Sequence, residues 1–140
     1  MLNLLRGEMY TGEGCSSIVY CHKRADCDSL AKALDKDGIG TRAYHAGMSA
    51  RERLEVQTAW SNNEARARVV CATVAFGMGI DNRNVRLVAH YSLPKSVEAF
   101  YQESGRAGRD GGEARSVLYY GAEDARLMLW LASKSKAERG

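Results

Sequence analysis

Metal-binding cysteine motifs are missing from this sequence. The chain has four cysteines, but none of them forms a C-x-x-C pair: Cys15, Cys21, Cys27 and Cys71. Structural zinc sites need closely spaced ligand pairs, so this spacing argues against one. We therefore expect no metal site in the chain, and we expect the thiols to be reduced, small hydrophobic side chains of an intracellular protein.

Long apolar runs and targeting segments are also missing. The longest nearly apolar run, residues 69–80, is too short to span a membrane and contains Thr73 and two glycines. No signal peptide is visible. We expect no membrane partner, and a location in the nucleus if the source is eukaryotic or in the cytoplasm or nucleoid if it is bacterial. A net charge of only +3 argues against non-specific polyanion binding but permits a local basic face.

Complete catalytic motifs are absent as well. The sequence has no G-x-x-x-x-G-K-[ST] loop to cradle a nucleoside triphosphate and no acidic pair after an apolar strand to hold Mg²⁺. It also has no G-x-S-x-G motif and suggests no Ser-His-Asp or Cys-His arrangement. Any phosphate site in this chain would therefore be half of a site, completed by another domain.

What the sequence does contain is a regular alternation of strand-like and helix-like segments. Apolar runs predict strands at 16–21, 41–46, 67–73, 85–91 and 115–120. Helical spacing and caps predict helices at 24–38, from the Ser49–Glu52 capping box to about Asn62, from Pro94 to Gly105, and from Glu123 past Trp130. Near-continuous apolar strands favour an α/β fold: a mostly parallel sheet of five or more strands with helices on both faces. We expect one domain over residues 15–140, preceded by a helix tail and linker over 1–14.

Ligands of such sheets meet the loops at the carboxyl ends of the strands. The sequence YHAGMS places His45 and Gly47 at one strand end, directly before a capped helix whose free amides can bind phosphate. A histidine satisfied within its own loop fits these residues equally well. His22, Lys23 and Arg24 form a basic cluster at another strand end, a pattern that is also typical of a solvated corner.

A glycine-containing loop, ATVAFGMGID, follows the third predicted strand. Gly77 and Gly79 would let backbone amides approach a phosphate or ribose closely, and Asp81 could accept hydrogen bonds from ribose hydroxyls. A tight strand-to-loop turn is the plain alternative. A dinucleotide-binding fingerprint fails, because its third glycine position is Asn82 and no clear helix begins there.

The stretch FYQESGRAGRDGG carries the clearest phosphate-binding pattern. On a helix, Gln102, Arg106 and Arg109 fall on one stripe, which forms an array of hydrogen-bond donors. Such an array favours an anion, and phosphate fits the planar arginine fork well. The alternative is a helix end whose arginines pair with Glu103 and Asp110.

Taken in order, IVYCHKR, AYHAGMS, ATVAFGMGID, HYSLPKSVEAFYQESGRAGRDG and VLYYGAEDARLM closely resemble the second RecA-like motor domain of RecQ-family DNA helicases. The resemblance covers residues 16–131, and FGMGID and QESGRAGRDG are its most specific parts. The ending YYGAEDARLM looks most like the branch of human RecQ-like helicase five. The resemblance implies a RecA-like three-layer fold.

For the nucleotide, the resemblance implies that ATP and Mg²⁺ lie between two RecA-like domains and are bound mainly by the first one. Arg109 would be the arginine finger, Arg106 its partner and Gln102 a polar orienter. Gly79 and Asp81 would contact the nucleotide or couple it to DNA.

For DNA, the resemblance implies that Arg24, His45, Gly47, Ser49 and Thr73 grip phosphates of the tracking strand, which moves in 3′-to-5′ steps. The expected partners are a single DNA strand, forks or junctions, and the N-terminal RecA-like domain of the same protein, in DNA repair or recombination. Because the first motor domain and the zinc module that commonly follows are both missing here, we expect the isolated chain to hydrolyse no ATP. An inert DNA- or protein-binding module from a truncated helicase, and an RNA helicase domain, remain as alternatives.

Overall fold

The computed structural model describes residues 15–73, 84–91, 97–107 and 114–118. Five strands form one sheet in the order β2-β3-β1-β4-β5. Their bounds are β1 Ser16–Tyr20, β2 Thr41–Tyr44, β3 Val69–Ala72, β4 Val85–His90 and β5 Arg115–Leu118. Every neighbouring pair is parallel, which confirms the predicted parallel sheet.

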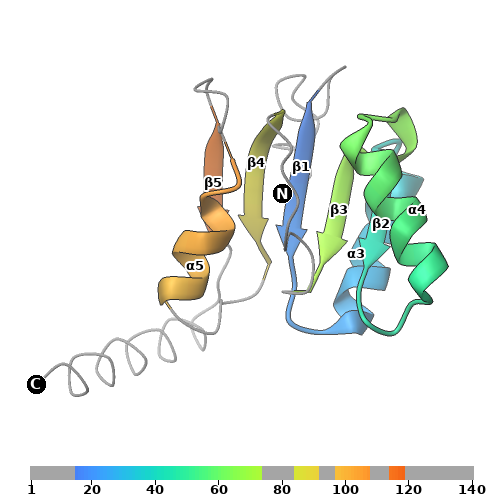
Figure 1. Ribbon diagram of the computed structural model, residues 1–140, viewed down its shortest axis with the longest axis horizontal. Helices are drawn as coiled ribbons and strands as arrows, with labels where there is room; N and C mark the ends of the chain where they lie inside the picture. Colours follow the sequence, from blue (N-terminus) through green and yellow to red (C-terminus); the bar gives the residue numbers. More distant parts are fainter. Residues whose placement is uncertain (1–14, 74–83, 92–96, 108–113, 119–140) are drawn as a thin grey trace, which may run out of the picture.

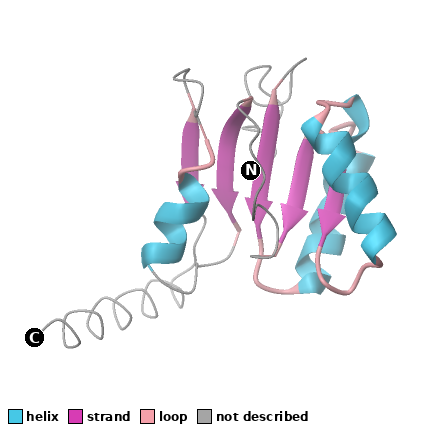
Figure 2. Cartoon of the chain, in the orientation of Figure 1, coloured by secondary structure: helices cyan, strands magenta, loops and turns pink. Residues whose placement is uncertain are grey.

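Helices cover both faces of this sheet, so the domain has three layers (Figure 1). One face carries α3, Arg24–Lys36, and the other carries α4, Ala50–Ser61, and α5, Val97–Ser104 (Figures 1 and 2). The α3 side buries Cys27, Ala31 and Leu34 together with strand residues such as Val19 and Cys71. The opposite side has its own core cluster: Ile18, Tyr20, Ala59, Trp60, Ala67, Val70, Ala72, Val85 and Val88. Burial on both faces explains why the strands read as continuous apolar runs.

The local signals at the helix ends are confirmed. Ser49 Oγ accepts the Glu52 amide at 3.1 Å, and the Glu52 carboxylate accepts the Ser49 amide at 3.2 Å. Gly38, just after α3, has a φ of 91°, a left-handed conformation that favours glycine. The Trp60 indole donates to the Ser17 carbonyl at 3.2 Å, which joins α4 to the central strand.

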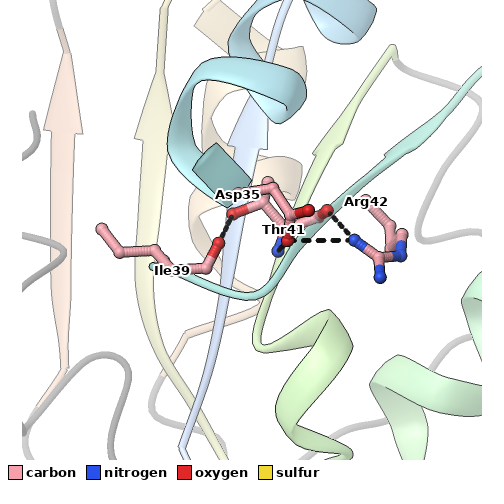
Figure 3. A network of polar contacts seen from close by, with 4 residues as sticks. All are labelled: Asp35, Ile39, Thr41 and Arg42. Carbon is pink, nitrogen blue, oxygen red and sulfur yellow. Dashed lines mark hydrogen bonds and ion pairs between the residues drawn. The ribbon is translucent and has the colours of Figure 1, made fainter. Parts of the chain in front are cut away.

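A polar network fixes the turn from α3 into β2 (Figure 3). The Thr41 hydroxyl donates to the Ile39 carbonyl at 2.7 Å, and the Thr41 amide donates to Asp35 Oδ1 at 3.4 Å. The Arg42 guanidinium donates to the same Asp35 oxygen at 3.1 Å and to the Thr41 carbonyl at 2.7 Å. The end of α3 is therefore held against the start of β2.

Four strand predictions are too long. Those over 16–21 and 85–91 run one residue too far, because β1 ends at Tyr20 and β4 at His90. The other two differ by more. Residues Ala65–Ala67 form a 3₁₀ turn, and β3 begins only at Val69. The cause is a tertiary contact, because the Ala65 carbonyl lies against Gly40 and occupies the space where a side chain would begin. The strand predicted over 41–46 ends at Tyr44, and the loop that contains His45 follows it.

The remaining predictions fall partly or wholly outside the described segments. For the helix predicted from Pro94, the structure describes Val97–Ser104; for the last predicted strand, it describes Arg115–Leu118. The predicted segment 1–14 and the predicted helix from Glu123 lie wholly outside the described residues. Within the described part, none of the helices has the length and apolar character needed to cross a bilayer.

Candidate functional site

All five predicted DNA-contacting residues lie in or beside the loops at the carboxyl ends of strands. Arg24 begins α3 just after β1; His45, Gly47 and Ser49 lie between β2 and α4; and Thr73 follows β3. Since β2, β3 and β1 are neighbours in the sheet, the three loops lie side by side. The structure therefore brings these five residues together, while their contact with DNA remains a prediction.

His45 is held inside its own loop. Its side chain is 8% exposed, and its Nε2 lies 2.9 Å from Asp28 Oδ1 on α3. Its Nδ1 accepts the backbone N–H of Gly47 at 3.1 Å. Asp28 was not among the predicted site residues, because nothing in the local sequence links it to a histidine 17 positions later.

Glycine suits position 47 in this arrangement. A Cβ atom at this position would lie 3.0 Å from His45 Nδ1, 3.1 Å from its Cε1 and 3.5 Å from Arg24 Cδ. A side chain at this position would therefore push the imidazole out of its place by a few tenths of an ångström. The exposed Ser49 uses its oxygen to cap α4, and its O–H proton can still be donated to a ligand.

A second group of predicted residues lies at the end of α5, next to β4 and β5 (Figure 1). Gln102 is exposed on α5, and Arg106 is half-buried in the turn that follows. The Arg106 amide donates to the Glu103 carbonyl at 3.2 Å, which continues the helical turn. Arg109, Gly79 and Asp81 lie outside the described residues.

A group of side chains that the sequence did not predict as a unit lies next to Arg106. It consists of Tyr20, His90, Phe100 and Glu103 and is here called the His90 cluster. The Tyr20 and His90 rings, which end β1 and β4, stack with centroids 5.4 Å apart, and Phe100 of α5 lies 5.0 Å from His90. Glu103 Oε1 lies 3.4 Å from His90 Nε2, and the two side chains are only 12% and 1% exposed. The sequence offered one signal for this cluster, because each of the two apolar strands β1 and β4 ends in a polar residue.

The electrostatics of Tyr20 tie Arg106 to this cluster. Burial, followed by the negative charge of Glu103, raises the pKa of Tyr20 to about 12, while the charge of Arg106 and its hydrogen bond with the phenol oppose the rise. Arg106 is therefore anchored on the edge of the sheet through Tyr20.

The cysteines are structural side chains. Cys21, Cys27 and Cys71 are buried, Cys15 is partly exposed, and all four are free thiols. Burial raises the pKa of the Cys71 thiol, which keeps it protonated and unreactive. No three His, Cys, Asp or Glu side chains gather into a metal-binding group in the described part of the chain.

Comparison with known proteins shows that this chain is similar to helicases. The family described as helicase conserved C-terminal domain matches residues 1–111. A RecQ-like DNA helicase BLM of Xenopus laevis is 52% identical over 109 residues, which is 78% of this chain and 8% of that protein. An ATP-dependent DNA helicase Q5 of Rattus norvegicus is 45% identical over 128 residues, 91% of this chain and 13% of that protein. The chain thus spans a small part of these relatives, and relatives of both types match it, so the predicted branch remains a prediction.

Among solved structures, the Escherichia coli DEAD-box protein SrmB, bound to the regulator of ribonuclease activity A, aligns with a TM-score of 0.76 at 28% identity. The alignment covers 88% of this chain and 69% of that chain. This likeness confirms the predicted RecA-like α/β fold.

Proposed function

The chain belongs to the helicase conserved C-terminal domain family, as a RecQ-family member, and from this premise we propose that it is the second motor domain of an ATP-dependent DNA helicase. The observation that carries the proposal is the family match, which covers both groups of candidate residues and extends to residue 111. The chain contributes part of an ATP site and part of a DNA track, and a first RecA-like domain completes both.

The α5 end serves the nucleotide in this proposal. Gln102 is exposed and can orient a polar group, and Arg106 is positioned by Tyr20 at the same end of α5. Guanidinium donors fit a phosphate, whereas the chain has no phosphate loop and no acidic pair for Mg²⁺. The nucleotide and Mg²⁺ are therefore bound mainly by the first domain, where the ion neutralises phosphate charge.

Arg109 acts in this proposal as the arginine finger and Arg106 as its partner. The charge that develops on the transferred phosphoryl group needs a donor that stays ionised and matches its oxygens, and arginine does both. Gly79 and Asp81 contact the nucleotide or couple it to the DNA track.

The β1, β2 and β3 loops serve the DNA strand. Arg24 offers an exposed guanidinium, and Ser49 and Thr73 offer hydroxyl donors to successive phosphates. Gly47, whose amide N–H is donated to His45, lets the loop approach the DNA strand closely. Closing and opening of the cleft between the two domains moves the strand in 3′-to-5′ steps, in DNA repair or recombination. Because these residues include no phosphate loop, we expect them to turn over no ATP by themselves.

Reconstitution tests the proposal. The chain is mixed with a first RecA-like domain of a RecQ-like helicase, and ATP hydrolysis is measured with and without single-stranded DNA. We expect no turnover from either part alone and DNA-stimulated turnover from the mixture or from both domains joined in one polypeptide. A joined protein that binds DNA without hydrolysing ATP would favour the inert binding module, and stimulation by RNA but not by DNA would favour the RNA helicase.

A further inference from the structure

The imidazole of His45 connects two separate elements at the DNA-facing edge. One ring nitrogen lies 2.9 Å from the Asp28 carboxylate on α3, and the other accepts the Gly47 amide at 3.1 Å in the loop after β2. The side chain is 8% exposed. Both polar atoms of a buried ring are thus used within the chain.

The direction of these hydrogen bonds fixes the proton on the ring. A backbone N–H can only donate, so Nδ1 of His45 must carry a lone pair. The single proton of a neutral imidazole then lies on Nε2, from which it is donated to the Asp28 carboxylate. A doubly protonated ring would place the Nδ1 proton against the Gly47 amide proton, and that hydrogen bond would be lost.

A neutral, buried ring with both nitrogens occupied has no donor left for a phosphate. The cation that the structure places beside this loop is Arg24, which is exposed and lies one helical turn before Asp28 on α3. Arg24 Cδ would lie 3.5 Å from a Cβ on Gly47, so the loop runs close beside the arginine stem. A shift of the loop would therefore change the surroundings of the Arg24 side chain.

We propose that Asp28 is a positioning residue of the DNA track, which fixes the orientation of the His45 ring so that the imidazole shapes the loop, while Arg24 carries the charge to the phosphate. The inference rests on the proposed function, because it assigns roles within the DNA track of that helicase. It replaces the expected phosphate contact of His45 with a contact that fixes the loop.

The ring proton is tested first, on the full chain alone. Histidine is labelled with ¹⁵N, and a long-range ¹H–¹⁵N spectrum at neutral pH reports which ring nitrogen carries the proton. We expect Nδ1 of His45 to resonate as an unprotonated nitrogen and Nε2 as a protonated one. A cationic ring or the opposite tautomer would overturn the inference, whether or not the chain binds DNA.

DNA binding is tested with a fluorescein-labelled oligothymidine over a series of KCl concentrations, using the two-domain motor. Asp28→Ala removes a negative charge, so charge alone would tighten binding; the positioning role instead predicts binding about fivefold weaker. Asp28→Asn removes the same charge but keeps an oxygen that accepts from Nε2, so we expect it to restore binding. Arg24→Gln should lower the salt slope by about 0.7, the value for one phosphate of a single strand, whereas Asp28→Ala should leave the slope unchanged.

Tighter binding by Asp28→Ala, or an unchanged slope with Arg24→Gln, would contradict the assigned roles. If Asp28→Ala does not fold by circular dichroism, Gly47→Ala takes its place, because its Cβ would press on the imidazole and should weaken binding with the same unchanged slope. A wild-type motor that binds no DNA would overturn the proposed function, while the nitrogen spectrum would still decide the state of His45.

Discussion

The contact between Glu103 and His90 can be used to test the arrangement of side chains in the His90 cluster. Glu103→Gln keeps the size and shape of the side chain and removes its charge, so the change acts through electrostatics and leaves no cavity. We expect two consequences: lower stability, and a lower pKa of Tyr20, because the charge of Glu103 is the second largest cause of the raised value.

The magnitude follows from distance and burial. The Glu103 carboxylate oxygen lies 3.4 Å from His90 Nε2, and the two side chains are only 12% and 1% exposed, so bulk water screens this contact little. Burying the carboxylate also carries a desolvation cost, which offsets part of the contact. We therefore expect Glu103→Gln to lower the free energy of unfolding by about 1–3 kcal/mol, the range for changing one partner of a buried polar contact.

The chain offers a matched control for this experiment. Arg51 and Glu55 on α4 are also separated by 3.4 Å, but their side chains are 90% and 62% exposed. Water screens such a pair, so Glu55→Gln should change the unfolding free energy by less than about 0.5 kcal/mol. The two variants therefore differ in burial rather than in the distance across the pair.

Urea unfolding of both variants, and spectrophotometric titration of tyrosine in the folded proteins, supply the two readouts. Equal stabilities of Glu103→Gln and Glu55→Gln, together with an unchanged Tyr20 titration, would refute the claim that Glu103 lies in a buried, electrostatically coupled cluster.

Three further predictions can be checked on the same chain. Gly40→Ala should destabilise the fold by about 1–3 kcal/mol in urea unfolding, because its Cβ would press into the Ala65 carbonyl. Wild-type stability of this variant would contradict the close contact between Gly40 and Ala65. Tyr20 has a folded pKa of about 12 against a reference value of 10.0, so the folded state retains its proton longer and stability should fall as pH rises through this range. The loss should reach about 3 kcal/mol, and Tyr20→Phe should abolish that part of it, as measured by urea midpoints across the range. A thiol reagent should modify Cys15 well before Cys71 in the folded chain, since one is partly exposed and the other is buried with a raised pKa; equal rates would contradict the described core.

Local sequence signals predicted most of the secondary structure in the described segments. The capping box at Ser49 and Glu52 and the glycine at position 38 lie where the sequence predicted them, and the ends of β1 to β4 lie within two residues of their predicted positions. These features depend on residues close together in the chain. The start of β3 was placed too early because the contact between Gly40 and Ala65 joins distant segments and is invisible to local patterns.

The candidate site also has some features that local sequence signals predicted and others that they did not. Strand ends predicted which loops share an edge of the sheet, and the structure brings Arg24, His45 and Thr73 to that edge. The contacts of His45 with Asp28 and of His90 with Glu103 could not be predicted, because each joins side chains from different elements. Such contacts depend on how helices pack on the sheet, which periodicity alone does not specify.

The central claim is that this domain completes an ATP site shared with another domain, and Arg109→Ala tests it most directly. DNA-stimulated ATP hydrolysis is measured for the two-domain motor with and without the substitution, alongside binding of ATP and DNA. An arginine finger contributes roughly 10³ to 10⁵ in turnover, so we expect a loss of that size with binding of both ligands retained. Turnover close to that of the unsubstituted motor would mean that Arg109 plays no part in catalysis and would contradict the shared site.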